Sequence, residues 1–268
     1  MRTLAIPYDS TKGPLIMGAS GRLGQALARV WEGPAPVWQT RDGAGGTLAW
    51  DILQHPAPEL REINGIVVLA GVTAGLPEAL ALNTPLAQAG SDLGARLGVP
   101  VLIASTQAVY GRQPGLMGED APLMPANDYG RAKQAMEAAV AAPHVTALRI
   151  GNVAGCDALA TGIARGAVVL DRFAGGQGPR RAMLGPLDLC HVIQRLLSVP
   201  ARPPILNVAR PGLVAMADVL RAAGVPFTWR VAAADALPEL AMDVSLLQEI
   251  CPLSSADAAT MAAQGGLG

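Results

Sequence analysis

The chain has 268 residues, of which 51% are hydrophobic and 15% charged, and its formal net charge at pH 7 is −1. This length and composition favour a compact core over disorder, and the balanced charge leaves no basic surplus for nucleic acid. The apolar runs are too short to span a membrane and no leader pattern opens the chain, so we expect a cytoplasmic protein with neither nucleic-acid nor membrane partners.

The three cysteines and three histidines are widely spaced. None of the CxxC, HExxH or HxH patterns that hold metals or disulfide frameworks is present. The sequence therefore predicts reduced, partly buried thiols and no metal site.

Short apolar runs alternate with amphipathic stretches along the first two thirds of the chain, a pattern typical of βαβ units. The expected strands cover residues 15–18, 36–40, 47–50, 65–70, 99–105, 145–150 and 205–208. The expected helices cover residues 23–32, 77–97, 128–142 and 187–198. The pattern predicts an α/β fold, namely a doubly wound parallel (Rossmann) sheet with a small C-terminal substrate lobe.

The regularity fades after residue 151, and glycine and proline gather over residues 175–186. We expect a first domain over residues 1–155 and a smaller lobe mainly over residues 156–268, with residues 186–210 returning to the first domain. The Ala- and Gly-rich stretch 256–268 has few large side chains, which predicts a weakly held helix with a frayed end.

A glycine-rich turn follows the first expected strand and opens a helix, with Gly18, Gly21 and Gly24 in GxxGxxG spacing. Glycines let the backbone approach a pyrophosphate, which the N–H groups of a helix N-terminus can bind. Because the chain has 31 glycines, the spacing alone is weak evidence for a dinucleotide-binding turn. Its position between an expected strand and an expected helix strengthens that evidence.

The second expected strand ends in Thr40-Arg41-Asp42, without an acidic residue at its tip for the ribose of NAD. Arg41, together with Arg22, could pair with a 2′-phosphate, which favours NADP(H) and leaves NAD as the other cofactor. Alternatively, both arginines are ordinary solvated side chains. Asp51 could accept from the adenine amino group or cap a helix.

Tyr129 and Lys133 stand four residues apart in an expected helix, so the phenol and the ammonium project from one face. Thr106 stands at the carboxyl end of a parallel strand, where α/β sheets bind ligands. Together they could transfer a proton: Lys133 is expected to lower the pKa of the phenol, and Thr106 to polarise the substrate oxygen. Alternatively, Tyr129 and Lys133 form a surface pair and Thr106 only ends a strand.

These motifs occur in the order found in the extended short-chain dehydrogenase/reductases, the NAD-dependent epimerase/dehydratase family, which the chain resembles from residue 15 to about residue 208. The matching segments are residues 18–24, 64–71, 105–111, 129–137 and 148–153. The resemblance implies that the first domain is a dinucleotide-binding Rossmann domain and that the lobe binds the substrate.

The resemblance also implies a set of site residues. The implied catalytic residues are Thr106, Tyr129 and Lys133. The implied cofactor contacts are Gly18, Ser20, Gly21, Arg22, Leu23, Gly24, Arg41, Asp51, Ile52, Leu69, Ala70, Gly71, Asn83, Tyr129 and Lys133. The implied substrate contacts are Thr106, Gln107, Asn152 and Arg181. Asn83 would help to hold Lys133 in place.

Two departures from the family pattern bear on the reaction. Gln107 and Ala108 replace the acidic residue that dehydratases carry after the catalytic hydroxyl, which disfavours dehydration. The family's later arginine-containing segment has no clear counterpart near Arg230, so a substrate smaller than a nucleotide-linked sugar is compatible with the chain.

The resemblance implies an NAD(P)-dependent oxidoreductase that moves a hydride between a nicotinamide cofactor and a small carbonyl or alcohol, sugar-derived substrates included. Two alternatives remain open: an NAD-dependent sugar epimerase, and a non-catalytic protein that senses the cofactor. The resemblance further implies a homodimer formed through the helices expected at 77–97 and 128–142.

Overall fold

The computed structural model describes residues 11–60 and 62–267. Its centre is a seven-stranded sheet in the order β12-β7-β5-β4-β1-β2-β3, and every neighbouring pair is parallel. The strands are β1 (Leu15–Met17), β2 (Val37–Thr40), β3 (Leu48–Ala49), β4 (Ile66–Val68), β5 (Val101–Thr106), β7 (Val145–Ile150) and β12 (Ile205–Val208).

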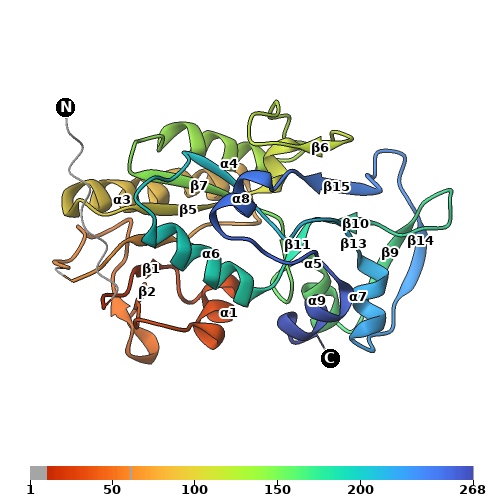
Figure 1. Cartoon of the computed structure of the whole chain (residues 1–268), viewed down its shortest axis with the longest axis horizontal. Helices are drawn as coiled ribbons and strands as arrows, with labels where there is room; N and C mark the ends of the chain where they lie inside the picture. Colours follow the sequence, from red (N-terminus) through yellow and green to blue (C-terminus); the bar gives the residue numbers. More distant parts are fainter. Residues whose placement is uncertain (1–10, 61, 268) are drawn as a thin grey trace.

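Helices cover both faces of this sheet. They are α1 (Arg22–Val30), α2 (Pro77–Ala81), α3 (Asn83–Leu97), α4 (Asp128–Ala139) and α6 (Pro186–Ser198). Figure 1 shows α3 and α4 on one face and α1 and α6 on the other. The strands β1, β4 and β7 are buried along their whole length, as apolar runs in a sheet covered on both sides should be. The predicted doubly wound parallel sheet is confirmed.

The helix expected over residues 77–97 consists of two helices that meet at Leu82. Pro85, in the first turn of α3, has no N–H to donate to the carbonyl of Ala81, and its ring crowds that carbonyl. The first helix therefore ends at Ala81, and proline is tolerated only because α3 starts anew.

A smaller lobe of short elements, with a four-stranded mixed sheet in the order β13-β10-β15-β6, lies beside the carboxyl ends of the main strands (Figure 1). The lobe as a whole contains, besides the four strands of that sheet, two pairs of strands, β8 with β11 and β9 with β14. The bounds of its strands are β6 (Leu116–Met117), β8 (Asn152–Val153), β9 (Val169–Arg172), β10 (Arg180–Arg181), β11 (Met183–Leu184), β13 (Val214–Ala215), β14 (Thr228–Val231) and β15 (Glu239–Met242). The remaining helices are α5 (Ala158–Ala164), α7 (Met216–Ala222), α8 (Ser245–Ile250), α9 (Ala258–Gly265) and the short 3-10 helices η1 (Ala44–Gly46) and η2 (Gln107–Tyr110).

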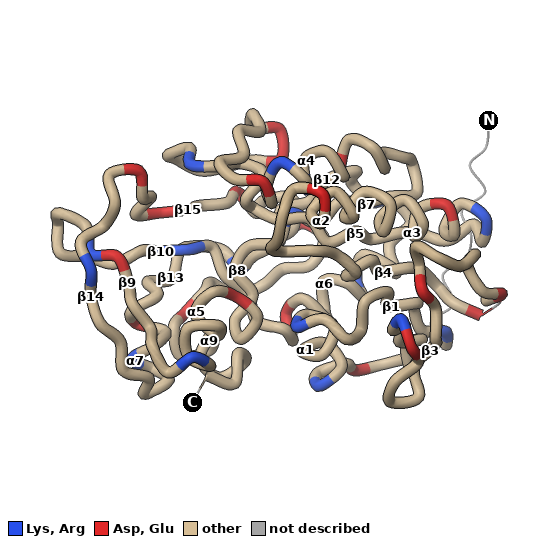
Figure 2. The backbone as a smooth tube through the Cα atoms, turned by 180° about the vertical axis from the view of Figure 1, so that it is seen from behind, with Lys and Arg blue, Asp and Glu red and all other residues tan. Residues whose placement is uncertain are grey.

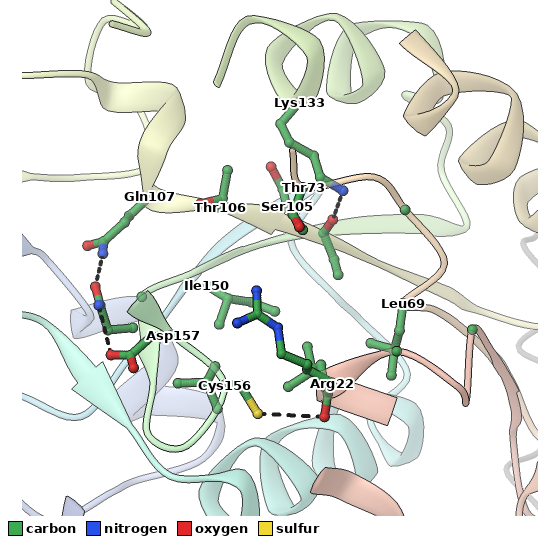
Figure 3. Close-up of a pocket in the computed structure, with 18 of the residues that line it drawn as sticks. Arg22, Leu69, Thr73, Ser105, Thr106, Gln107, Lys133, Ile150, Cys156 and Asp157 are labelled. Atoms are coloured by element: carbon green, nitrogen blue, oxygen red, sulfur yellow. Dashed lines mark hydrogen bonds between the residues drawn. The ribbon is translucent and has the colours of Figure 1, made fainter. Parts of the chain in front are cut away.

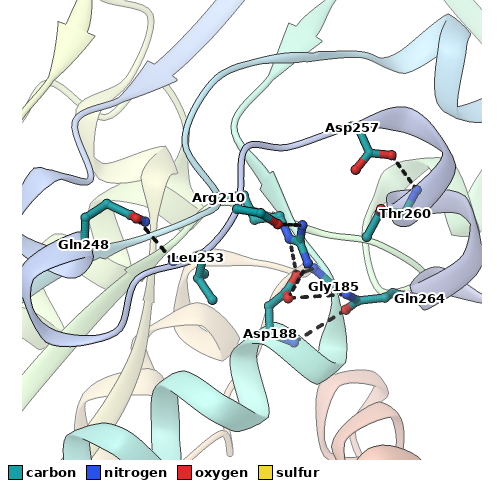
Figure 4. Close-up of polar contacts among 9 residues, drawn as sticks. Gly185, Asp188, Arg210, Gln248, Leu253, Asp257, Thr260 and Gln264 are labelled. Carbon is teal, nitrogen blue, oxygen red and sulfur yellow. Dashed lines mark hydrogen bonds and ion pairs between the residues drawn. The ribbon is translucent and has the colours of Figure 1, made fainter.

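The C-terminal helix α9 is firmly packed, so the expectation of a weakly held helix was wrong. Asp257 caps it by accepting from the Thr260 N–H at 2.8 Å, and Met261 is completely buried. Gln264 contacts Asp188 of α6, whose carboxylate is held by Arg210 through two hydrogen bonds of 2.7 Å (Figure 4). The small side chains that suggested weak packing instead allow close approach to α7.

Acidic and basic residues are interspersed along the described chain, as Figure 2 shows. Within residues 11–60 and 62–267, every helix is too short or too polar to cross a membrane.

Candidate active site

The site lies where the strand order of the main sheet reverses. The chain passes from β1 to β2 on one side and later to β4 on the other, which opens a crevice at the carboxyl ends of these strands. A cavity of about 360 Å³ fills this crevice (Figure 3). Twelve of the sequence-predicted site residues line it: Gly18, Gly21, Arg22, Leu23, Gly24, Leu69, Gly71, Thr106, Gln107, Tyr129, Lys133 and Asn152.

The glycine turn is shaped so that only glycine fits at two of its positions. A Cβ on Gly18, whose φ is +90°, would lie 2.5 Å from the Ala70 nitrogen, and one on Gly24 would lie 2.6 Å from the Gly18 oxygen. Helix α1 begins directly after Gly21 and no side chain caps it. Its first N–H groups are therefore available to an anion, so the turn fits a dinucleotide pyrophosphate.

Helix α4 brings Tyr129 to the tip of β5. Its N-cap Asn127 accepts from the Gly130 N–H at 2.8 Å, which starts the helix immediately before Tyr129. A Cβ on Gly130 would lie 2.6 Å from the Ala108 oxygen, so this glycine lets α4 press against η2, just beyond Thr106. The arrangement places the phenol and the Thr106 hydroxyl at one wall of the cavity.

The pKa values of the two titrating groups move in opposite directions. Burial raises the pKa of the Tyr129 phenol above its ordinary value of 10, and a hydrogen bond with the Thr106 side chain partly opposes this rise. Burial lowers the pKa of Lys133 from 10.5 to about 8, against the opposing charge of Glu137. We expected Lys133 to lower the pKa of the phenol; its Nζ instead donates to the Ala104 carbonyl at 2.8 Å, and burial dominates at Tyr129.

Asn83 is fully buried and fixes the loop that follows β4. Its Nδ2 donates to the carbonyls of Val72 and Leu80 at 2.9 and 2.8 Å, and its Oδ1 accepts from the Val72 N–H at 3.2 Å. A Cβ on Gly71 would lie 2.6 Å from Asn83 Oδ1 and 3.4 Å from Lys133 Nζ. Asn83 therefore supports the backbone beside Lys133 rather than the cavity directly.

The two arginines considered for a 2′-phosphate differ in their surroundings. The Arg41 side chain is 85% exposed, does not line the cavity, and lies 3.9 Å from a carboxylate oxygen of Asp51. Arg22 lines the cavity and donates to Thr161 Oγ1 of helix α5 at 2.7 Å. The other predicted cofactor contacts outside the cavity lining are Ser20, Asp51, Ile52, Ala70 and Asn83.

Two of the four predicted substrate contacts, Gln107 and Asn152, are joined in the cavity wall. Gln107 Nε2 donates to Asn152 Oδ1 at 2.5 Å, and Asn152 Nδ2 donates to Asp157 Oδ2 at 3.1 Å. Arg181, by contrast, does not line the cavity, and its guanidinium donates to backbone carbonyls, among them that of Pro238 at 3.2 Å.

Several cavity residues were not expected from the sequence, and Asp157 is the most consequential because it is charged. It caps α5 by accepting from the Ala160 N–H at 3.2 Å, and burial raises the pKa of its carboxyl. An Asp before an Ala-rich run is a helix-start signal, which could have located it. The other unexpected lining residues are Thr73, Ala104, Ser105, Ile150, Gly151, Val153 and Cys156.

No group of three or more His, Cys, Asp or Glu within the described ranges is arranged to hold a metal ion. The cavity's own reactive or charged side chains supply a phenol, hydroxyls, an ammonium, a guanidinium, a thiol and a carboxylate.

Comparisons with known proteins bear on the family resemblance and the fold. The family model described as "NAD dependent epimerase/dehydratase family" matches residues 60–168. That match confirms the resemblance to the NAD-dependent epimerase/dehydratase family, the extended short-chain dehydrogenase/reductases. No curated protein matches the sequence.

Solved structures share the fold at low identity. UDP-glucose-4-epimerase from Stenotrophomonas maltophila, with bound NAD and formylated UDP-arabinopyranose, has a TM-score of 0.76 and 18% identity, with 95% of this chain and 96% of that chain covered. UDP-N-acetylglucosamine 4-epimerase from Bacillus cereus has a TM-score of 0.75, 18% identity and 96% coverage of both chains. MoeE5 in complex with UDP-glucuronic acid and NAD has a TM-score of 0.73, 21% identity, and coverages of 95% and 98%.

Proposed function

We propose that this chain is a nicotinamide-dependent enzyme that oxidises a hydroxyl of a sugar-derived substrate and returns the hydride to the same molecule, as an epimerase does. The observation that carries the proposal is that Thr106, Tyr129 and Lys133 line one cavity together with the glycine turn. A phenol, a hydroxyl and an ammonium around one space are the groups that proton transfer beside a hydride acceptor requires.

In this proposal Tyr129 exchanges a proton with the reacting oxygen and Thr106 donates a hydrogen bond that orients that oxygen. When bound, the nicotinamide supplies the hydride acceptor and donor. Lys133, protonated below pH 8, offers the positive charge that offsets the burial of a phenolate, and Asn83 keeps the backbone next to it in place. The glycine turn and the N-terminus of α1 would hold the pyrophosphate.

Two candidate functions differ in where the hydride goes. An epimerase returns it to the same substrate molecule, whereas a reductase or dehydrogenase exchanges it with a cofactor that then leaves. Two structural neighbours are named as 4-epimerases and one of them contains bound NAD, which supports an epimerase with NAD as its cofactor. The exposed guanidinium of Arg41, whose Nε lies 3.9 Å from Asp51, supports the second candidate, an NADP(H)-dependent reductase or dehydrogenase, because a solvent-exposed guanidinium could turn to a 2′-phosphate.

Replacement of the phenol tests the catalytic assignment. We expect Tyr129→Phe to lower turnover by about 10²- to 10⁴-fold, since proton transfer is lost, while the Kd for the dinucleotide stays unchanged. The measurements are steady-state turnover on a panel of sugar alcohols and aldoses, and a fluorescence titration with NAD and NADPH. Full activity of the variant would remove Tyr129 from the mechanism, and dinucleotide binding without turnover in the natural chain would favour the cofactor-sensing alternative.

Cofactor exchange separates the epimerase from the reductase. An epimerase should be purified with tightly held NAD and should interconvert its substrate without added cofactor. A reductase should exchange NADPH freely and consume it in proportion to product.

A further inference from the structure

We propose that Asp157, Asn152 and Gln107 form a subsite that selects hydroxyl donors of an unphosphorylated sugar and rejects the diphosphate of a nucleotide-linked sugar. This inference rests on the proposed function, because the subsite belongs to the cavity that holds Tyr129 and Lys133. It names the class of substrate that reaches those groups.

The hydrogen-bond directions follow from the carboxylate. Because an ionised Asp157 only accepts, the amide nitrogen of Asn152 must face it, at 3.1 Å. The Asn152 oxygen then faces Gln107, which must donate through its own nitrogen, at 2.5 Å. The chain of three side chains therefore has one orientation, and Figure 3 shows it along one side of the cavity, away from Leu69.

This orientation leaves a buried acceptor for a ligand, and each amide nitrogen carries a second N–H besides the one it donates within the chain. Gln107 Oε1 is buried and has no hydrogen-bond partner among the described residues. Asp157 uses one oxygen for Asn152 and the other for the Ala160 N–H, and each carboxylate oxygen can accept more than one hydrogen bond. A buried carbonyl oxygen without a donor is costly, so the subsite favours a ligand that brings hydroxyl groups.

The charges near the subsite oppose an anion. The charged side chains that line the cavity are Arg22, Lys133 and Asp157. Lys133 is 5% exposed and bonded to the Ala104 carbonyl, whereas Arg22 rises from the glycine turn and is bonded to Thr161. Asp157 is the charged residue in the hydrogen-bonded chain with Asn152 and Gln107, so a diphosphate placed against that chain would face a carboxylate.

The guanidinium that a diphosphate would need is turned to other partners. Arg181 lies outside the cavity lining and donates to the carbonyls of Arg180, Leu237 and Pro238. Burial raises the pKa of the Asp157 carboxyl, and hydrogen bonds from Asn152 and the Ala160 N–H partly oppose this rise.

Binding of UDP to the natural chain and to Asp157→Asn tests the proposal without requiring turnover. Asparagine keeps the N-cap of α5 through its one oxygen, and its amide nitrogen then faces Asn152, whose amide can turn over to accept from it, so the fold should persist. The matched control is Asp257→Asn, which changes the N-cap of α9 outside the cavity. Each protein is saturated with NAD and titrated with UDP by calorimetry.

We expect UDP to bind the natural chain and the Asp257→Asn control with a Kd above about 1 mM, and Asp157→Asn at least about tenfold more tightly, which corresponds to about 1.4 kcal/mol. Tight binding of UDP to the natural chain overturns the proposal, and so does an Asp157→Asn variant that gains nothing. If NAD does not bind, the proposed function fails. The subsite is then tested by the same UDP titration on the cofactor-free proteins, in which Asp157→Asn should still bind UDP more tightly than Asp257→Asn.

A second titration uses glucose, galactose, xylose and their UDP-linked forms. We expect an unphosphorylated sugar to bind the natural chain with NAD and to lose about tenfold in affinity in Asp157→Asn, the loss typical of a hydrogen bond to a charged group. Binding of the UDP-linked sugars alone, or of no free sugar, overturns the proposal.

Discussion

The ammonium group of Lys133 is almost completely buried, with 5% of the residue exposed. Its partners are the Ala104 carbonyl at 2.8 Å and the Met136 sulfur at 3.7 Å, neither of which carries a compensating charge. A lysine kept in such surroundings lowers the stability of the fold in exchange for a cation beside Tyr129.

Lys133→Met should therefore raise stability and abolish activity together. A pKa lowered from 10.5 to about 8 corresponds to a cost of about 3 kcal/mol in the folded state, which is present below pH 8. The cost disappears as the pH rises from about 8 to 10.5, because over this range the unfolded chain retains the proton that the folded chain has lost. Urea unfolding at pH 7 and pH 10 should show a stability gain only at the lower pH.

The matched control for this prediction is Arg131→Met, which removes an exposed cation from the same helix. Its free energy of unfolding should stay within about 0.5 kcal/mol of the natural chain at both pH values. An equal gain by both variants would show that helix propensity, not the buried charge, is responsible.

Helix α4 and the strands β5 and β7 are joined behind the cavity by a buried polar network. Glu137 of α4 accepts from the Ser105 hydroxyl of β5 and pairs with Arg149 of β7 at 2.9 Å. Arg149 also donates to the Tyr110 hydroxyl at 3.0 Å and to the Glu119 carbonyl at 2.8 Å. The network fixes α4 on the strand that carries Thr106.

Loss of the Glu137 charge should be severely destabilising. Glu137→Gln leaves the Arg149 guanidinium charged and buried without its counterion, at a cost of about 3 to 5 kcal/mol. Asp128→Asn removes the exposed partner of Arg131 on the same helix and should cost less than about 1 kcal/mol. Urea unfolding of both variants checks the prediction, and equal costs would contradict it.

Elements with strong local patterns were predictable from the sequence. The mainly apolar runs of β7 and β12 predicted the observed bounds, because strands covered on both faces are rich in hydrophobic residues. Helix α5 was missed, since seven residues of mostly small side chains carry too little periodicity. The packing of α9 depends on Asp188 and Arg210, which are distant in the sequence, and no local pattern encodes such contacts.

The residues of the candidate site also fall into those that local sequence patterns predicted and those whose contacts depend on distant parts of the chain. Thr106, Tyr129 and Lys133 were predictable because each follows from spacing within one element, and the structure brings them to one cavity. Arg181 was expected to reach the substrate, yet the loop at residues 237–238 occupies its guanidinium, a contact across more than fifty residues.

At the scale of the whole molecule, the lobe and the glycine turn are tied together at the cavity. Arg22 of the turn donates to Thr161 of α5, and the Cys156 thiol contacts the Arg22 carbonyl at 3.7 Å. Gln264 of α9 donates to Asp188 of α6 at 3.3 Å and holds the lobe at a second point (Figure 4).

Thr161→Val should speed the release of a bound dinucleotide. The substitution preserves the shape of the side chain but removes the acceptor for Arg22, so α5 rests less firmly on the turn. We expect the dissociation rate to rise about three- to tenfold, the range set by one hydrogen bond. Stopped-flow displacement measures this rate, Thr260→Val in α9 is the control, and equal rates in both variants would refute the prediction.

The Arg22–Thr161 contact joins helix α5 to the segment that the proposed dinucleotide would touch. If that contact slows release of the dinucleotide, one cofactor molecule would serve many substrate molecules. Such retention would suit the proposed reaction, in which the hydride returns to the molecule that gave it.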